Sequence, residues 1–266
     1  MINKKECCGC TACMHICPMK CIAMEEDEEG FLYPVINEEK CIHCHKCENV
    51  CPIQNIKNSD ARTATLVGYS RNEEIRKQSS SGGIFSVLAE WILQQNGVVF
   101  GAAFDENFEV HHIAVETKDE LAKLRGSKYV QSRLENVYPK TKQCLEMQRK
   151  VLFTGTACQI AGLKNYLRKE YDNLYTVDVL CHGVPSPKIW RMYLEEKKKQ
   201  YHASVEKFEF RNKENGWKNY SINILFSNTQ QYCVHYFEDK FIKMFLGNID
   251  LHPSCYECHF KEFPRM

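Results

Sequence analysis

Two copies of one cysteine motif constrain this chain more than any other feature. The pattern C-x2-C-x2-C-x3-C-P runs from Cys7 to Pro18 and again from Cys41 to Pro52. Three thiolates at two-residue spacing can converge on one metal cluster from a tight loop, and the Cys-Pro step then turns the chain toward a second cluster. The repeated pattern therefore predicts a single small folding unit that holds two 4Fe-4S clusters.

The fourth cysteine of each copy is expected to ligate the cluster of the other copy, as is usual for this bacterial ferredoxin pattern. Zinc knuckles are the alternative, but zinc sites usually pair two C-x2-C steps or include histidine. His15, His43 and His45 lie among the ligands, where packing or hydrogen bonding to cluster sulfur is expected. Residues 22–40 fit a hairpin that turns near Glu29 and Gly30. The expected ligands are Cys7, Cys10, Cys13 and Cys51 for the first cluster, and Cys41, Cys44, Cys47 and Cys17 for the second.

The cysteine content and the net charge indicate the cellular compartment of the protein and exclude some classes of partner. Of its 266 residues 16 are cysteine, and no apolar stretch precedes the first of them. No apolar run reaches the roughly 18 to 20 residues of a membrane-spanning helix. A long cysteine-rich chain of this kind is typical of a reducing compartment, so we expect a cytoplasmic protein without a membrane span. A net charge of +1 gives no field toward nucleic acid, and none is expected as a partner.

After a polar segment at 56–65, which suits a linker, the sequence alternates between helical and strand patterns. This alternation predicts an α+β fold, in which a small two-cluster ferredoxin-like module precedes a mixed α/β body. Expected helices cover 84–96, 140–148, 159–171, 189–201 after Pro187, and 239–247, with a short one from the Thr117–Glu120 capping box to Leu124. Expected strands cover 98–104, 110–115, 151–155, 174–180, 205–210, 220–227 and 232–237.

Three loops of the body combine small and basic residues in a way that suits a phosphate-bearing ligand. The first, 79–83 (SSSGG), precedes a predicted helix, where hydroxyls and glycine amides can bind an anion. The second, 125–132, carries Arg125 and Lys128, and the third, 155–162, joins a predicted strand to a predicted helix. A plain helix cap or a solvated charged loop explains each of them equally well.

Taken together, these segments and two others resemble a known family. SSSGGIFSVLAEWIL, RGSKYVQS, GTACQIAGL, CHGVPSP and SCYECHFK occur in this order along the chain. The chain resembles the coenzyme F420 hydrogenase/dehydrogenase beta subunit family, with a 2x 4Fe-4S ferredoxin domain in front. The resemblance implies a ferredoxin-type domain at 1–60, an N-terminal part of the beta subunit at 61–140 and a C-terminal part at 141–266.

Relatives bind FAD and pass electrons between the flavin, iron-sulfur clusters and a soluble two-electron carrier, so the resemblance also implies cofactor sites. His182 is a candidate proton donor near the flavin, with a structural histidine as the alternative. A zinc or redox C-x2-C pair, or unligated cysteines, are the alternatives to a third 4Fe-4S cluster. FAD is expected at Ser79, Ser80, Ser81, Gly82, Gly83, Lys128, Gly155 and Thr156, and the third cluster at Cys158, Cys181, Cys255 and Cys258.

The remaining cysteines, Cys8, Cys21, Cys144 and Cys233, match no motif and are expected to be buried bystanders. The family body normally continues past the C-x2-C segment, whereas this chain ends at FPRM. The resemblance thus implies a C-terminally truncated body and leaves flavin binding open.

The predicted function is that of an iron-sulfur flavoprotein oxidoreductase, in which FAD converts electron pairs to single electrons and the module carries them. Its partner would be a redox protein or a soluble two-electron carrier, and the sequence does not identify the substrate. One alternative is a non-catalytic, ferredoxin-like electron-transfer subunit that docks a partner enzyme, for example one of polysaccharide biosynthesis. Another alternative is a truncated paralogue that keeps its ferredoxin module but has lost the active site of the body.

Overall fold

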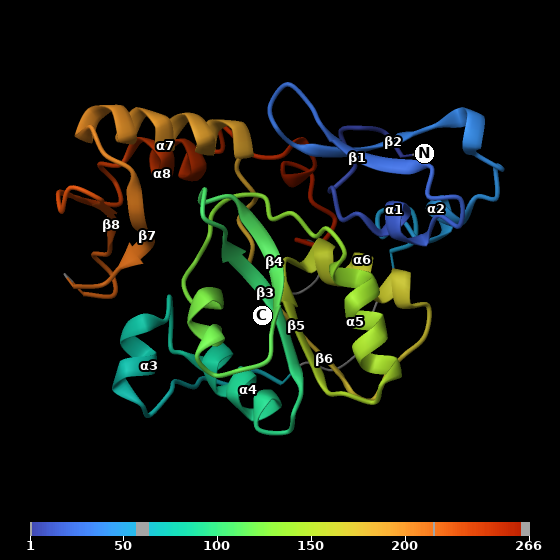
Figure 1. The fold of residues 1–266 in the computed structure, drawn as a ribbon, viewed down its shortest axis with the longest axis horizontal. Helices are drawn as coiled ribbons and strands as arrows, with labels where there is room; N and C mark the ends of the chain where they lie inside the picture. Colours follow the sequence, from blue (N-terminus) through green and yellow to red (C-terminus); the bar gives the residue numbers. More distant parts are fainter. Residues whose placement is uncertain (1, 57–63, 215, 262–266) are drawn as a thin grey trace.

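The computed structural model describes residues 2–56, 64–214 and 216–261, so most of the expected linker lies outside the described residues. A small cysteine-rich module, blue in Figure 1, rests on one end of a larger α+β body. Within the described ranges, no helix is long and apolar enough to span a membrane. The module contains helices α1 (Ala12–Ile16) and α2 (Lys46–Asn49), strands β1 (Ile22–Glu26) and β2 (Leu32–Ile36), and the 3-10 turn η1 (Glu38–Lys40).

Each copy of the cysteine motif forms a loop that leads into a short helix. Thr11 precedes α1 and His45 precedes α2, and both have left-handed backbone angles, with φ of 63° and 56°. Such angles are uncommon outside glycine and occur where a chain turns sharply. Between the copies, β1 and β2 pair in an antiparallel hairpin with Ile22 opposite Ile36. This confirms the hairpin expected within 22–40, whose turn places Gly30 at a φ of +83°.

The central sheet of the body has the strand order β4-β3-β5-β6. Strands β3, β5 and β6 run parallel, and β4 is antiparallel to β3. Because helices cover both of its faces, the residues of β3 and β5 are mostly buried apolar ones rather than alternating with polar ones. The bounds of these strands are Val98–Phe104 (β3), Val110–Val115 (β4), Val151–Gly155 (β5) and Leu174–Asp178 (β6).

Neighbouring residues of these strands belong to different cores. Phe100 and Phe153 share one core with α5 (Val137–Glu146) and α6 (Ala157–Leu167). Val99 lies in the opposite core, beneath α4 (Ile84–Leu93). The first core also takes in the module residues Cys10, Ala12 and Val50. The module is therefore packed into the body by burial of apolar surface, in addition to its connection through the chain.

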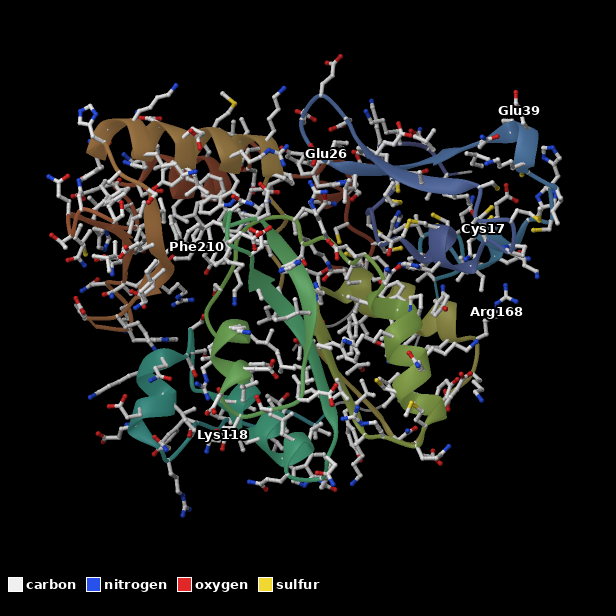
Figure 2. The ribbon with its side chains drawn as sticks, in the orientation of Figure 1. Cys17, Glu26, Glu39, Lys118, Arg168 and Phe210 are labelled. Carbon is white, nitrogen blue, oxygen red and sulfur yellow. The ribbon has the colours of Figure 1, made fainter. Side chains whose placement is uncertain are left out.

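A second sheet, β7-β8-β9, is antiparallel and lies beside two further helices. Its core is aromatic: Phe210, labelled in Figure 2, lies 5.2 Å from Trp190, measured between ring centroids. The indole N–H of Trp190 donates to the carbonyl oxygen of Phe108 at 2.7 Å, so this buried donor is satisfied. The elements are β7 (Val205–Asn212), β8 (Ser221–Phe226), β9 (Gln231–His235), α7 (Pro187–Tyr201) and α8 (Lys240–Leu246).

Helix ends and short elements differ most from the expectations. The helix expected at 159–171 starts at Ala157, because Thr156 and Gln159 form a capping box there, and ends at Leu167, because Arg168 is left-handed. The Thr117–Glu120 hydrogen bonds form as expected but introduce a 3-10 turn, η2 (Glu120–Leu124). In the body, the short elements α3 (Glu73–Gln78) and the 3-10 turn η3 (Pro253–Cys255) were not expected, and in the module neither were α1, α2 and η1.

Ion pairs and hydrogen bonds tie the hairpin of the module to the body. The carboxylate of Glu26 accepts from Arg133 and, at 2.7 Å, from Arg191, which also reaches Glu109 at 3.2 Å. Figure 2 shows Glu26 on the side of the module that meets the body, with Cys17 on the far side. At the hairpin turn, the Lys188 ammonium donates to the Glu28 carbonyl oxygen at 2.8 Å. This network fixes the orientation of the hairpin relative to α7.

Substitution of Gly30 by alanine should loosen this contact. A Cβ at Gly30 would lie 2.8 Å from the backbone nitrogen of Lys188, and the φ of +83° is itself unfavourable for alanine. We expect Gly30→Ala to lower the free energy of unfolding in urea by about 2 to 4 kcal/mol, from backbone strain and the clash together. Gly126→Ala is the matched control, because Gly126 has a φ of +82° with nothing within 4 Å of an added Cβ. Equal losses in the two variants would show that the contact with Lys188 is unimportant.

Candidate redox centres

The first set of predicted cluster ligands surrounds one cavity in the module. Three of its thiols come from the first motif copy and the fourth, Cys51, from the second, so the structure brings together the exchanged set that the pattern predicts. Burial raises the pKa of the Cys7 thiol to about 12. That these thiols ligate iron stays a prediction. The cavity is lined by Cys7, Cys10, Cys13 and Cys51, together with Cys8 and Cys47.

The second set surrounds a cavity of about 220 Å³ at the outer end of the module. Cys44 is exposed here, and the neighbouring Ile42 is 58% exposed. Cys47 lines this cavity and the first one, so the two ligand sets are adjacent. The predicted ligands in this cavity are Cys17, Cys41, Cys44 and Cys47, accompanied by Cys21, His43 and His45.

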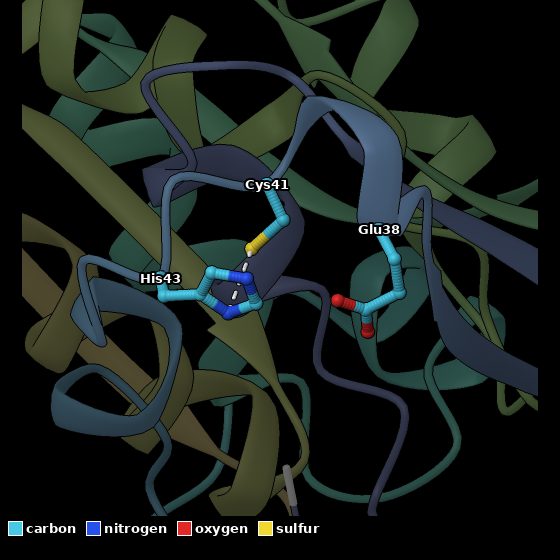
Figure 3. Close-up of side chains that lie close together, drawn as sticks. All are labelled: Glu38, Cys41 and His43. Carbon is cyan, nitrogen blue, oxygen red and sulfur yellow. Dashed lines mark hydrogen bonds between the residues drawn. The ribbon is translucent and has the colours of Figure 1, made fainter.

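Two side chains beside Cys41 offer further metal-binding atoms. Glu38, Cys41 and His43 each place one ligand atom within 4.8 Å of the others. Figure 3 shows the three side chains close together. The His43 Nδ1 atom lies 4.0 Å from the Cys41 sulfur. Asn37 caps η1 and thereby holds the turn that carries Glu38. A single metal ion bound here would compete with the second cluster for Cys41, whereas next to a cluster His43 can act as a hydrogen-bond donor.

The four predicted ligands in the body also meet around one cavity, of about 470 Å³. Cys158 is the second residue of α6, and Cys181 follows β6. Backbone pairing between Pro185 and Leu251 brings the C-terminal segment alongside the loop that follows Cys181. Four thiols from three distant segments thereby line one space, completed by Cys255 and Cys258.

The charges of these body thiols fit a metal-cluster site. Cys158 has a pKa lowered to about 7, first by a hydrogen bond from the Cys8 thiol and then by Thr156, whose Oγ1 lies 3.1 Å away. Burial, followed by repulsion from Cys158, raises the pKa of Cys181 to about 11 and that of Cys255 to about 12. Thiols crowded in this way become stable thiolates only when a metal shares their charge. The donor set and the space suit one 4Fe-4S cluster, although four thiolates also suit zinc.

The two loops expected to bind phosphate in the first half of the body lie in contact. The Ser127 hydroxyl is hydrogen-bonded to Ser80 at 2.8 Å, and Arg125 donates to the Ser86 hydroxyl of α4 at 3.0 Å. Gly83 caps α4 with a φ of +85°, a conformation that favours glycine. The structure therefore joins the SSSGG segment to the segment that carries Lys128.

The ammonium group of Lys128 is held by its own loop. Its Nζ donates to the carbonyl oxygens of Lys123, Arg125 and Gly126 at 3.0, 2.8 and 3.3 Å. Burial lowers its pKa to about 7. Neither Lys128 nor residues 79–83 line the 470 Å³ cavity, whereas Thr156 does. The residues expected to bind FAD are thus only partly brought together.

His182 lies beside the cysteine cavity rather than in it. Its neighbours Cys181 and Gly183 line the cavity, but the exposed His182 does not. Its ring packs edge-on against Phe245, with the ring centroids 4.9 Å apart. This contact suits a structural histidine, and the proton-donor role stays a prediction.

Family models match three successive stretches of the chain. Residues 6–55 match a 4Fe-4S dicluster domain, and residues 65–138 match the N-terminal domain of the coenzyme F420 hydrogenase/dehydrogenase beta subunit. Residues 148–264 match the C-terminal domain of the same subunit. The chain belongs to the coenzyme F420 hydrogenase/dehydrogenase beta subunit family. Its dicluster domain makes this family member an iron-sulfur protein.

Comparisons with individual proteins add little to the family assignment. No curated protein matches the sequence of this beta subunit family member. One solved structure with a similar chain is the F420-reducing [NiFe] hydrogenase complex from Methanosarcina barkeri, with 18% sequence identity and a TM-score of 0.48. The match covers 71% of this chain and 63% of the other, so the family member spans less than two thirds of that chain.

Four cysteines of the family member were expected to be buried bystanders. Cys144 is buried in α5 as expected, but Cys233 is exposed on β9, because its side of this edge strand is not covered. Cys21 is buried with its sulfur 3.4 Å from that of Cys17. Cys8 lines both the first module cavity and the body cavity. Its position directly after Cys7, within a motif loop, was the available sequence signal.

Iron release should distinguish the two predicted module clusters. The second set includes the exposed Cys44, whereas the first set includes the buried Cys10 and no exposed cysteine, so a chelator should remove about four irons in an early phase. Cys17→Ala should eliminate this phase, whereas Cys51→Ala should leave it and alter the slower release. The measurement is chelator absorbance against time under anaerobic conditions. Loss of the early phase in Cys51→Ala would contradict the exchanged ligand assignment.

Proposed function

We propose that the chain is an iron-sulfur flavoprotein oxidoreductase that moves single electrons through 4Fe-4S clusters and exchanges electron pairs with a substrate or carrier through FAD. The observation that carries the proposal is the succession of thiol-lined cavities. Cys47 borders the second and first module cavities, and Cys8 borders the first module cavity and the body cavity. These cavities form a continuous series from the exposed end of the module to α6.

The body offers FAD a suitable edge of its central sheet. Helix α6 directly follows β5, so its N-terminus lies at the carboxyl end of a parallel strand. Such edges and helix N-termini favour the pyrophosphate of a dinucleotide. Bound there, FAD would supply the conversion between electron pairs and single electrons. The SSSGG segment and the β5–α6 loop would hold its phosphates.

Lys128 would contribute charge and loop order. Its pKa of about 7 reflects burial without a neighbouring anion, so a phosphate at this loop would restore the full positive charge. Its three carbonyl contacts already hold the loop in one conformation, which lowers the entropic cost of binding.

Buried groups around β5 add rigidity to the same edge. His112 accepts from or donates to the Ser132 hydroxyl at 2.6 Å and contacts the Thr154 carbonyl oxygen at 2.9 Å. Burial lowers the pKa of His112 to about 4, so it stays neutral at physiological pH. His112 thereby fixes the end of β5 beside Gly155. If Gly155 carried a side chain, its Cβ would lie 3.4 Å from the Nε2 atom of His112.

The alternative is a non-catalytic electron-transfer subunit that docks a partner enzyme. One observation favours it: neither Lys128 nor the SSSGG segment reaches the cavity lined by the body cysteines. Well-folded protein without flavin would support this alternative. In either case, a one-electron partner protein would approach the exposed second cavity.

Quantitation of iron, sulfide and flavin after anaerobic purification tests the proposal. We expect about twelve irons and about one FAD per chain, because three 4Fe-4S clusters account for all twelve predicted ligands. Cys181→Ser should lower the iron content to about eight and leave FAD bound, since Cys181 is not among the expected flavin contacts. About eight irons in the unsubstituted protein would refute the third cluster.

A lysine substitution tests the flavin site separately. Lys128→Met should weaken FAD binding by about tenfold or more, because a charge-assisted hydrogen bond contributes roughly 1.5 to 3 kcal/mol. Lys123→Met is the matched control, since the exposed Lys123 contacts Lys128 through its backbone carbonyl and not its side chain. The measurement is quenching of FAD fluorescence on titration with flavin-free protein. An equal affinity in both variants would exclude a contact between Lys128 and FAD.

A further inference from the structure

Two basic side chains at the end of β7 lie close to the SSSGG segment. Arg211 and Lys213 alternate with the buried Phe210 and Asn212, so both are on the side of the strand that faces away from its aromatic core. The Lys213 ammonium donates to the Arg76 carbonyl oxygen of α3 at 2.8 Å. Because α3 ends directly before the SSSGG segment, this bond joins the second sheet to that segment.

Ser80, within the SSSGG segment, is contacted from two sides. The indole N–H of Trp217, which lies between β7 and β8, donates to the Ser80 carbonyl oxygen at 3.3 Å. On the other side, the Ser80 hydroxyl is hydrogen-bonded to Ser127 at 2.8 Å. Trp217 is 55% exposed, so its ring remains accessible to a ligand. Three segments that are distant in the sequence therefore meet at Ser80.

The positive charge at this place is not balanced by the protein. Arg76 is paired with Glu73 at 3.5 Å, but within the described ranges neither Arg211 nor Lys213 forms an ion pair. The Arg211 guanidinium lies over the Tyr220 ring, 4.4 Å from its centroid, and the Arg211 Nε atom is buried without a hydrogen-bond partner among the described residues. Burial, followed by repulsion from Arg211 and Arg76, lowers the pKa of Lys213. Cations that repel one another beside an unused donor favour a bound anion.

We propose that Arg211 and Lys213, together with the exposed ring of Trp217, form a phosphate-binding site beside the SSSGG segment. The inference deepens the proposed function and rests on it for the identity of the ligand. Guanidinium and ammonium groups donate to phosphate oxygens, and an indole ring packs against a planar group attached to the phosphate. The phosphate belongs either to FAD or to a phosphate-bearing two-electron carrier. Neither basic side chain, nor Trp217, is among the residues expected to bind FAD.

Titration of flavin-free, full-length protein with inorganic pyrophosphate, followed by calorimetry, tests the site. Arg211→Met and Lys213→Met should each weaken binding by about tenfold or more, because each removes a charge-assisted hydrogen bond. Arg211→Lys should retain part of the affinity, since it keeps the charge but loses the planar donor pair. Arg168→Met is the matched control, because Arg168 is an exposed arginine that follows α6. Figure 2 shows Arg168 across the molecule from Phe210, the neighbour of Arg211.

The same titration of FAD-loaded protein identifies the source of the phosphate. If FAD supplies it, the loaded protein no longer binds pyrophosphate, and Arg211→Met weakens FAD binding. If a carrier supplies it, the loaded protein still binds pyrophosphate, and Arg211→Met leaves the affinity for FAD unchanged. Either result supports a phosphate site at these side chains.

Two results would overturn the site. One is an equal affinity for pyrophosphate in Arg211→Met, Lys213→Met and Arg168→Met, and the other is the absence of pyrophosphate binding by the unsubstituted protein. Protein that binds pyrophosphate through Arg211 and Lys213 but never retains FAD would refute the flavin of the proposed function and leave the phosphate site in place. Circular dichroism establishes that each variant is folded. If Arg211→Met does not fold, Lys213→Met, which lies beyond the last residue of β7, decides the question.

Discussion

The rest of the arrangement depends on the contact between α6 and the first cysteine loop of the module. At Gly162 the helix approaches so closely that any side chain would touch Cys10, and the same helix presents Cys158 at its N-terminal turn. One rigid element thus contacts thiols of the module and supplies a thiol of the body. The separation between the two groups of cysteines is set by helix packing.

Around this contact, the chain concentrates sulfur in places with few compensating cations. Its net charge is only +1, and one basic side chain near the body cavity, Lys261, donates to the carbonyl oxygens of His182 and Cys255 rather than to a thiolate. Burial raises the pKa values of Cys7, Cys181 and Cys255 to about 11 or 12, so these three thiols are protonated at neutral pH in the absence of metal. A metal cluster bound at these cysteines would supply the positive charge that several neighbouring thiolates require.

The sequence predicted the order of helices and strands better than it predicted where individual helices end or how the expected flavin-binding residues lie. Strands β3 and β4 have the expected bounds, because a run of Val, Ile and Phe flanked by turn residues is a strong strand signal. Helix α6 starts and ends earlier than the expected helix at 159–171. Its ends are set by local details, the capping box at Thr156 and the left-handed backbone of Arg168. The two module sets were expected from their spacing, which suits the geometry of a cluster, whereas the body set was expected only from the family resemblance.

Other features of the site depend on tertiary packing. Cys8 matches no pattern, and its position between two cavities arises only when Gly9 and Gly162 allow the loop and α6 to meet. The relation of Lys128 to residues 79–83 depends on the contact between Ser127 and Ser80, which spacing along the chain does not reveal. Motif spacing therefore reports local chemistry, whereas the order of the sites in space is a property of the fold.

The exchanged positions of Cys17 and Cys51 have a consequence for how the protein matures in a cell. With ligands exchanged, the first cluster closes a chain loop that contains most of the second motif, and the second cluster closes one that contains the end of the first. Binding of either cluster would bring the remaining ligands closer together, so loading of one cluster would favour loading of the other. Assembly of the module would then depend on both motif copies at once, and neither copy would form a cluster site on its own.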